Sequence, residues 1–192
     1  PPNKNVVFYH QEFDLDVFHK GEPDFNSKKI ASFVHCLEEH DIFKQDWIDF
    51  QELEKLLPEY EFKSYGISNR DGTIVEQKDL ADKMRESKFG IHLKGGGDGF
   101  GHGIHSWFAV GRPVIFRGSQ YEGKLAGNLL KHGVTGFDID KLSLQKTAEK
   151  IRNLTKDEYD TMCENAYKTF KEVVNFTEEF ETKLKPFFAK LI

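Results

Sequence analysis

The chain has 192 residues, of which 38% are hydrophobic and 14% aromatic, with 18 phenylalanines, and this is enough to bury the core of one domain. Its net charge of −5 and the lack of a long basic stripe argue against a nucleic-acid-binding surface. No apolar run approaches the roughly 18 residues that a membrane-spanning helix needs.

The two cysteines, Cys36 and Cys163, lie far apart and lack the spacing of metal ligands. Such cysteines are typical of free thiols in a reducing compartment. The chain begins with Pro-Pro and shows no signal-like start. We therefore expect a soluble, cytoplasmic protein without a transmembrane segment.

Short apolar runs alternate with helix-length stretches along the chain. Continuous apolar strands are typical of a parallel sheet covered on both faces, and the alternation indicates βαβ units. The sequence predicts an α/β fold, a Rossmann-like three-layer α/β/α domain with a mainly parallel sheet and ligands at the carboxyl ends of its strands. The expected strands are 5–9, 30–35, 60–65, 88–93, 113–116 and 135–139, and the expected helices lie near 46–57, 77–86, 103–110, 121–131 and 143–153.

Two more helices are expected near the end of the chain, because Thr155 with Glu158 and Asn175 with Glu178 have the spacing of capping boxes. Pro186 is expected to kink or restart the last helix. Residues 10–28 indicate a linker or an irregular crossing segment.

The most informative segment holds six glycines within residues 95–103, between a predicted strand and a predicted helix. Glycines let backbone N–H groups approach a ligand closely, and a helix N-terminus favours phosphate. A dinucleotide fingerprint does not fit, because Gly103 comes one residue early after Gly99 and Gly101, and a P-loop would need Gly-Lys-Ser/Thr. A flexible linker would have polar flanks, whereas these flanks are apolar. The segment therefore predicts the floor of a nucleotide-sugar site.

One stretch within this segment is Asp98-Gly-Phe-Gly101, and a second stretch after it is Ala109-Val-Gly111-Arg-Pro113-Val-Ile115. They resemble the motif of retaining GT-B glycosyltransferases (glycosyl transferases group 1, family 4-like), in which Glu-Gly-Phe-Gly is followed by a second Glu eight residues on and by Ala-x-Gly-x-Pro-Val-Ile. His132-Gly-Val-Thr-Gly-Phe-Asp138 is similar to a segment near the last strand of that family. With weaker matches elsewhere, the resemblance covers roughly residues 5–191.

The resemblance implies the C-terminal half of a GT-B fold. Residues 1–28 would be the end of the first domain and the interdomain linker, 29–174 the donor-nucleotide-binding domain, and 175–192 a helix that packs back toward a missing N-terminal domain. That domain would supply the acceptor site and any membrane association. The chain alone would bind donor but transfer sugar poorly or not at all.

The resemblance also implies site residues. Asp98 stands at the first carboxylate, which positions the donor sugar, and is the predicted catalytic residue. Ser106 replaces the second Glu, which holds the ribose, and Cys36 replaces an Arg that contacts the diphosphate; Lys94, Arg117 and Lys124 are candidates to supply the lost charge. The predicted donor and phosphate contacts are Lys44, Lys94, Gly99, Phe100, Gly101, His102 and Gly103. The predicted ribose and base contacts are Ser106, His105, Ile74 and Val75.

His102 and His105 lie three residues apart, hence on one helix face, and Asp98 precedes them. This pattern is a weak metal signature, and we expect neither a bound metal nor a cofactor. His102 is expected beside the diphosphate and His105 beside the ribose. The alternative is that both histidines are packed or solvated on the helix.

The leading interpretation is a hexosyltransferase-type glycosyltransferase domain that takes sugar from a UDP- or GDP-linked donor. One alternative is a non-catalytic nucleotide-sugar-binding or assembly module with a degenerate donor site, for which Cys36 and Ser106 argue. Another is an epimerase that acts on a sugar nucleotide. The sequence does not identify the sugar, the base or the acceptor.

Overall fold

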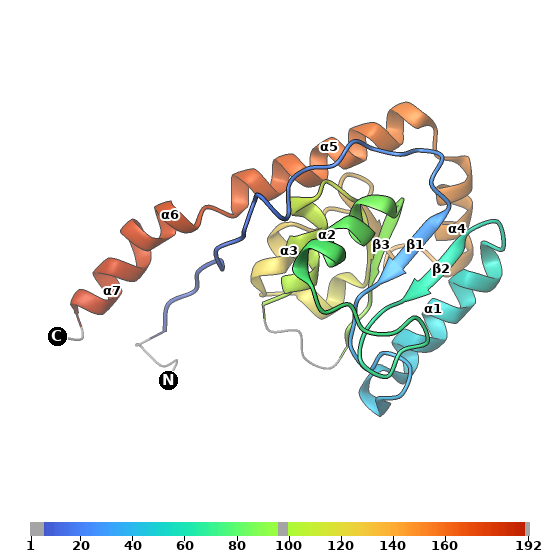
Figure 1. Ribbon diagram of the computed structural model, residues 1–192, viewed down its shortest axis with the longest axis horizontal. Helices are drawn as coiled ribbons and strands as arrows, with labels where there is room; N and C mark the ends of the chain where they lie inside the picture. Colours follow the sequence, from blue (N-terminus) through green and yellow to red (C-terminus); the bar gives the residue numbers. More distant parts are fainter. Residues whose placement is uncertain (1–5, 96–99, 191–192) are drawn as a thin grey trace.

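The computed structural model describes residues 6–95 and 100–190. Within them, five strands form one parallel sheet in the order β2-β1-β3-β4-β5. Figure 1 shows β1 between β2 and β3. The predicted parallel α/β fold is therefore confirmed, and each strand lies where an apolar run predicted it. The strands are β1 (Lys29–Ser32), β2 (Glu61–Ser64), β3 (Phe89–His92), β4 (Val114–Phe116) and β5 (Gly136–Asp138).

Helices connect the strands and follow the last one. Most lie within two residues of their predicted bounds, and Thr155 and Glu158 form a complete capping box at the start of α5. A π-helical turn, η4 (Phe180–Leu184), precedes the last helix, so the helix restarts next to Pro186 as expected. The α-helices are α1 (Lys44–Leu56), α2 (Gln77–Glu86), α3 (His102–Ala109), α4 (Leu144–Asn153), α5 (Lys156–Val173), α6 (Phe176–Glu179) and α7 (Lys185–Ala189); a 3₁₀ helix, η1 (Asp41–Phe43), precedes α1.

Two predicted elements are wrong. Residues 6–9, expected in a strand, are not part of the sheet, because their neighbours are helical: the Tyr9 ring lies 6.5 Å from that of Phe176 in α6. The helix expected at 121–131 is instead two 3₁₀ helices, η2 (Gly118–Tyr121) and η3 (Leu125–Asn128). Gly123 lies between them with φ 71°, a left-handed conformation that interrupts a right-handed helix.

The core has two parts, one on each face of the sheet. Ile30 and Ile115 face one part, which α1 and α4 cover, whereas their neighbours Ala31 and Val114 face the other part with α3. Alternate residues of a strand point to opposite faces, so a strand buried on both faces is apolar throughout, as the sequence pattern indicated.

The N-terminal segment and the end of α5 leave the sheet together and extend to one side with α6 and α7 (Figure 1). Glu179 of α6 joins them. Its carboxylate accepts a hydrogen bond from the backbone N–H of His10 at 2.5 Å and pairs with Nδ1 of the His10 ring at 2.9 Å. Burial acts to raise the pKa of Glu179, but hydrogen bonds from His10 and Lys183 hold it below its ordinary value. Two segments at opposite ends of the sequence are thus connected by a buried pair. The predicted division of the chain at residues 28 and 175 stays a prediction.

Gly90 in β3 lets α3 pack closely on the sheet. A Cβ at this position would lie 2.5–2.7 Å from atoms of the Trp107 indole, which is fully buried. The glycine therefore provides the flat surface against which the indole lies.

We expect Gly90→Ala to lower the free energy of unfolding by roughly 1–3 kcal/mol, because the buried indole would have to shift. Urea denaturation measures this. Gly72→Ala is a comparison variant without crowding: nothing lies near the added Cβ, and its φ of 78° makes it report backbone strain, which Gly90→Ala lacks. A Gly90→Ala variant as stable as the wild type would contradict this packing.

Lys88 is buried just before β3, with 2% of its surface exposed. Its ammonium group lies 4.0 Å from the Phe25 ring centroid and 5.3 Å from that of Tyr159, and cation–π attraction compensates part of its lost hydration. Burial nevertheless lowers the pKa of Lys88 from its ordinary value.

A lysine whose pKa is lower in the folded state binds more protons when unfolded, so stability rises with pH between the folded pKa and the unfolded value of about 10.5. Lys88→Met removes this contribution. We expect the unfolding free energy of the wild type to rise relative to that of Lys88→Met as the pH rises toward 10.5. Parallel urea titrations at several pH values measure the difference, and a difference independent of pH would refute the assignment.

Candidate functional site

The carboxyl ends of the parallel strands meet at one edge of the sheet. The chain turns outward from β1 to β2, then returns to place β3 on the other side of β1. The loops after β1 and β3 therefore diverge, which is where open α/β sheets bind ligands. The segment rich in glycine follows β3 and begins at this point.

Only part of that segment is within the described residues. Lys94 and Gly95 lie before the gap, and Phe100 comes after it. The predicted catalytic residue Asp98 and the predicted phosphate contact Gly99 lie outside the described residues, so their roles stay predictions.

Two glycines at the start of α3 are required by packing. Gly101 is the N-cap with φ 79°, and a Cβ there would collide with Ala126 of η3. Gly103 faces the ring of His92, to which an added Cβ would come within 2.7 Å. Because Gly101 has no side chain, it offers no capping group to the first amides of α3. The two glycines thus allow the start of α3 to pack closely against η3 and β3.

The N-terminal segment covers one face of α3. The Phe13 ring stacks 5.1 Å from that of His102 and 5.9 Å from that of His105, and Phe100 stacks on His105 at 4.3 Å. His105 is fully buried, and its Nδ1 donates to the Gly101 carbonyl oxygen at 2.8 Å. Ser106 is also buried and donates to the His102 carbonyl oxygen at 3.0 Å. For His105 the packed alternative fits this geometry, whereas His102 is exposed.

The candidate cations lie in different surroundings. Lys44 is exposed and is the first residue of α1, and Lys94 is half-buried after β3. Arg117, after β4, forms ion pairs with Asp49 and, at 3.0 Å, with Asp140. Lys124 lies over the Tyr121 ring at 5.5 Å. Arg117 therefore neutralises carboxylates of its own protein rather than presenting its charge to a ligand.

Asp46, which the sequence analysis did not single out, holds the start of the segment. Its Oδ2 accepts from the Gly95 N–H at 2.6 Å, and its Oδ1 accepts from the Gln120 side chain at 2.9 Å. Gln120 in turn accepts from the Lys94 N–H at 2.9 Å. The loops after β3 and β4 are thus fixed to α1. An acidic residue in the first turn of a helix is ordinarily a partner of the helix dipole, so no sequence signal points to this role.

The predicted base contacts lie after β2, at the edge of the sheet. Val75 is 83% exposed and Ile74 is half-buried. The loop after β2 is joined to the loop after β1, because the Ile67 amide donates to His35 Nδ1 at 2.9 Å and the Cys36 amide to the Ile67 carbonyl oxygen. Cys36 has a φ of 56°, a left-handed turn conformation.

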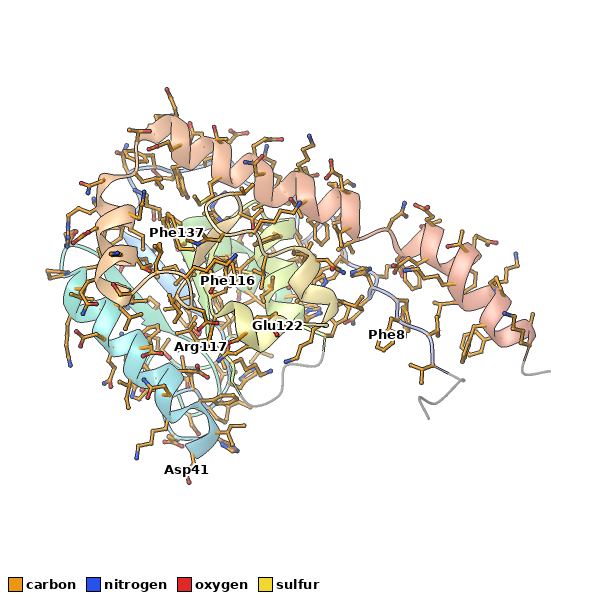
Figure 2. The ribbon with its side chains drawn as sticks, turned by 180° about the vertical axis from the view of Figure 1, so that it is seen from behind. Phe8, Asp41, Phe116, Arg117, Glu122 and Phe137 are labelled. Carbon is orange, nitrogen blue, oxygen red and sulfur yellow. The ribbon has the colours of Figure 1, made fainter. Side chains whose placement is uncertain are left out.

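A separate cavity of about 1240 Å³, the β4–β5 groove, lies at the other end of the same edge. Figure 2 shows Glu122 between Arg117, at the end of β4, and Phe8 on the N-terminal segment. The groove adjoins the glycine segment at Phe100. It is lined by Val7–Tyr9, Phe100, Phe116, residues from 118–132, Asp138, Asp140 and Lys141.

Comparison with known proteins gives matches of structure but not of sequence. No protein-family model matches the chain, and no curated protein matches it. A solved structure of Anabaena HepE in complex with UDP-glucose superposes with a TM-score of 0.68 at 16% identity, covering 92% of this chain and 56% of HepE. The C-terminal domain of LpcC, a group 1 family glycosyl transferase from Francisella tularensis, gives a TM-score of 0.55 at 14% identity, covering 84% of this chain and 97% of that domain.

This chain has the fold of a GT-B C-terminal domain. The pneumococcal O-GlcNAc transferase GtfA, solved with UDP and GlcNAc, also matches, with a TM-score of 0.61 and 18% identity over 90% of this chain and 38% of GtfA. The fold expected from the resemblance is therefore confirmed. The chain spans about half the length of HepE and a smaller part of GtfA.

Within residues 6–95 and 100–190, no helix is long and apolar enough to cross a membrane. Across the same residues, no three His, Cys, Asp or Glu side chains come together as metal ligands would.

We expect Asp46→Asn to lower the unfolding free energy by about 1–3 kcal/mol, because its amide N–H₂ would face a donor and leave one buried group unpaired. The exchange of the Gly95 amide proton, measured by NMR, should accelerate. Asp41→Asn, at an exposed position just before α1, is the matched control. Unchanged Gly95 exchange in Asp46→Asn would show that Asp46 does not hold the segment.

Proposed function

We propose that this domain binds the nucleotide diphosphate sugar donor of a glycosyltransferase, with a UDP- or GDP-linked hexose as donor. The observation that carries the proposal is the position of the glycine segment: it follows β3 at the point where strand order reverses and leads into the N-terminus of α3. Structural relatives at low sequence identity were solved with UDP-glucose and with UDP and GlcNAc, which supports this class of ligand.

The diphosphate would lie at the start of α3, where backbone N–H groups and the helix dipole favour anions. Lys44, the exposed first residue of α1, keeps its expected role of supplying positive charge to the diphosphate. The exposed His102 is the first residue of α3, and the half-buried Lys94 lies on the loop after β3. Phe100 and the amides of Gly101 and Gly103 complete this side of the proposed site.

Other parts of the donor are assigned from the resemblance. Val75, with Ile74 beside it, is accessible for contact with a base. Asp98 keeps its expected role of positioning the sugar, and Gly99 that of a phosphate contact. The ribose role of His105 and Ser106 stays a prediction; both side chains are buried, so it requires Phe13 and Phe100 to move.

The reaction itself is proposed to need a further domain. The chain covers 56% of HepE, and we propose that an N-terminal domain completes the acceptor side. The 192-residue chain alone would then bind the donor without transferring its sugar. Catalysis would rest on orientation and on stabilisation of the departing diphosphate.

Isothermal titration without metal against UDP, GDP, ADP and their sugar conjugates tests the proposal. We expect one nucleotide to bind selectively, and Asp98→Ala to weaken its sugar conjugate but not the bare nucleotide. Lys44→Ala should weaken both roughly tenfold, about 1.4 kcal/mol, because it removes charge from the diphosphate. Lys55→Ala, at an exposed position near the end of α1, is the control.

Absence of nucleotide binding to the folded domain would contradict the proposal for this chain and favour the alternative of a degenerate donor site, to which the replacements at Cys36 and Ser106 point. Equal weakening by Lys44→Ala and Lys55→Ala would remove Lys44 from the site.

A further inference from the structure

The β4–β5 groove is a second cavity with its own construction. One side of the groove is formed by η2 and η3, the pair of 3₁₀ helices between β4 and β5. Its outer side is formed by the N-terminal segment. Phe100 lines the groove and is also one of the residues proposed to bind the donor. Its volume of about 1240 Å³ exceeds the roughly 300–1,000 Å³ usual for small-molecule sites. The size suits an elongated ligand.

One wall of the groove presents aromatic rings to solvent. Phe8 is 70% exposed and Tyr9 is 42% exposed, and both line the cavity with Phe100. Large apolar side chains that stay exposed beside a cavity are a marker of ligand contact. Their flat faces suit the C–H face of a sugar ring, which is apolar and withdraws from water on contact.

The opposite wall is polar, and its charges argue against a phosphate. Three carboxylates line the groove, Glu122, Asp138 and Asp140, against the ammonium groups of Lys124 and Lys141. The acidic groups on β5 and just after it are bound internally: Asp138 accepts from the Gly118 amide at 2.9 Å, and Asp140 pairs with Arg117. With Arg117 paired to Asp140, the charges at this wall are close to balance and offer a nucleotide diphosphate no excess of positive charge, whereas a neutral hydroxyl can donate to a carboxylate such as Glu122.

We propose that the β4–β5 groove binds a neutral oligosaccharide, with Phe8 and Tyr9 against its ring faces and Glu122 accepting from its hydroxyls. Its role as an acceptor subsite rests on the proposed donor function. In that role a saccharide hydroxyl oxygen forms a bond to the anomeric carbon, the bond from that carbon to the diphosphate breaks, and the hydroxyl proton leaves with the diphosphate. The shared residue Phe100 places the groove next to the proposed donor site.

The test uses saturation-transfer NMR and titration of the 192-residue chain with cellotriose, maltotriose and chitotriose, without nucleotide. We expect at least one trisaccharide to bind. Phe8→Ala and Glu122→Ala should each weaken it by roughly fivefold or more. Both positions are exposed, so the fold should be unaffected. Phe188→Ala, an exposed aromatic residue of α7 outside the groove, should leave binding unchanged.

The result separates this inference from the donor proposal. Lys44→Ala should not change trisaccharide binding, and Glu122→Ala should not change nucleotide binding. Trisaccharide binding without nucleotide binding would support the groove and refute the donor site. No binding of any of the three sugars, equal binding by the groove variants and the wild type, or loss of nucleotide binding in Glu122→Ala would overturn the inference.

Discussion

The carboxyl edge of this domain depends on the compensation of one buried carboxylate. Asp46 exposes 3% of its surface, and a charge that is removed from water must find its partners inside the protein. Those partners are the Gly95 amide and the Gln120 side chain, with the Arg117 guanidinium 3.9 Å away. Because these partners lie on the loops after β3 and β4, one side chain of α1 joins both loops.

The second constraint comes from outside the sheet. The N-terminal segment lies on α3, where Phe13 stacks against two histidines, and His10 is held by Glu179 of α6. The N-terminal segment therefore influences which side chains of α3 are accessible to a ligand: His102 is exposed, whereas His105 and Ser106 are buried. The segments that flank the α/β unit thus shape the proposed donor site, although neither belongs to the sheet.

The two ends of the carboxyl edge differ in charge. Lys94 and His102 flank the glycine segment, Lys44 is the first residue of α1, and the helix dipole at the start of α3 favours phosphate. Around the β4–β5 groove, carboxylates outnumber ammonium groups and Arg117 is occupied by Asp49 and Asp140. The same strand ends therefore provide one region suited to a diphosphate and one suited to a neutral ligand, with Phe100 between them.

The sequence by itself determined where five strands and the start of α5 lie: short apolar runs predicted six strands, five of which form the sheet, and the capping box of Thr155 and Glu158 predicted the helix start, because these signals are local. It also placed the glycine segment between a strand and a helix. The tertiary structure alone decided that Arg117 is neutralised by Asp49 and Asp140, that Asp46 holds Gly95, and that residues 6–9 pack beside a helix. These outcomes depend on residues far apart in the chain, whose proximity arises only when the sheet has formed.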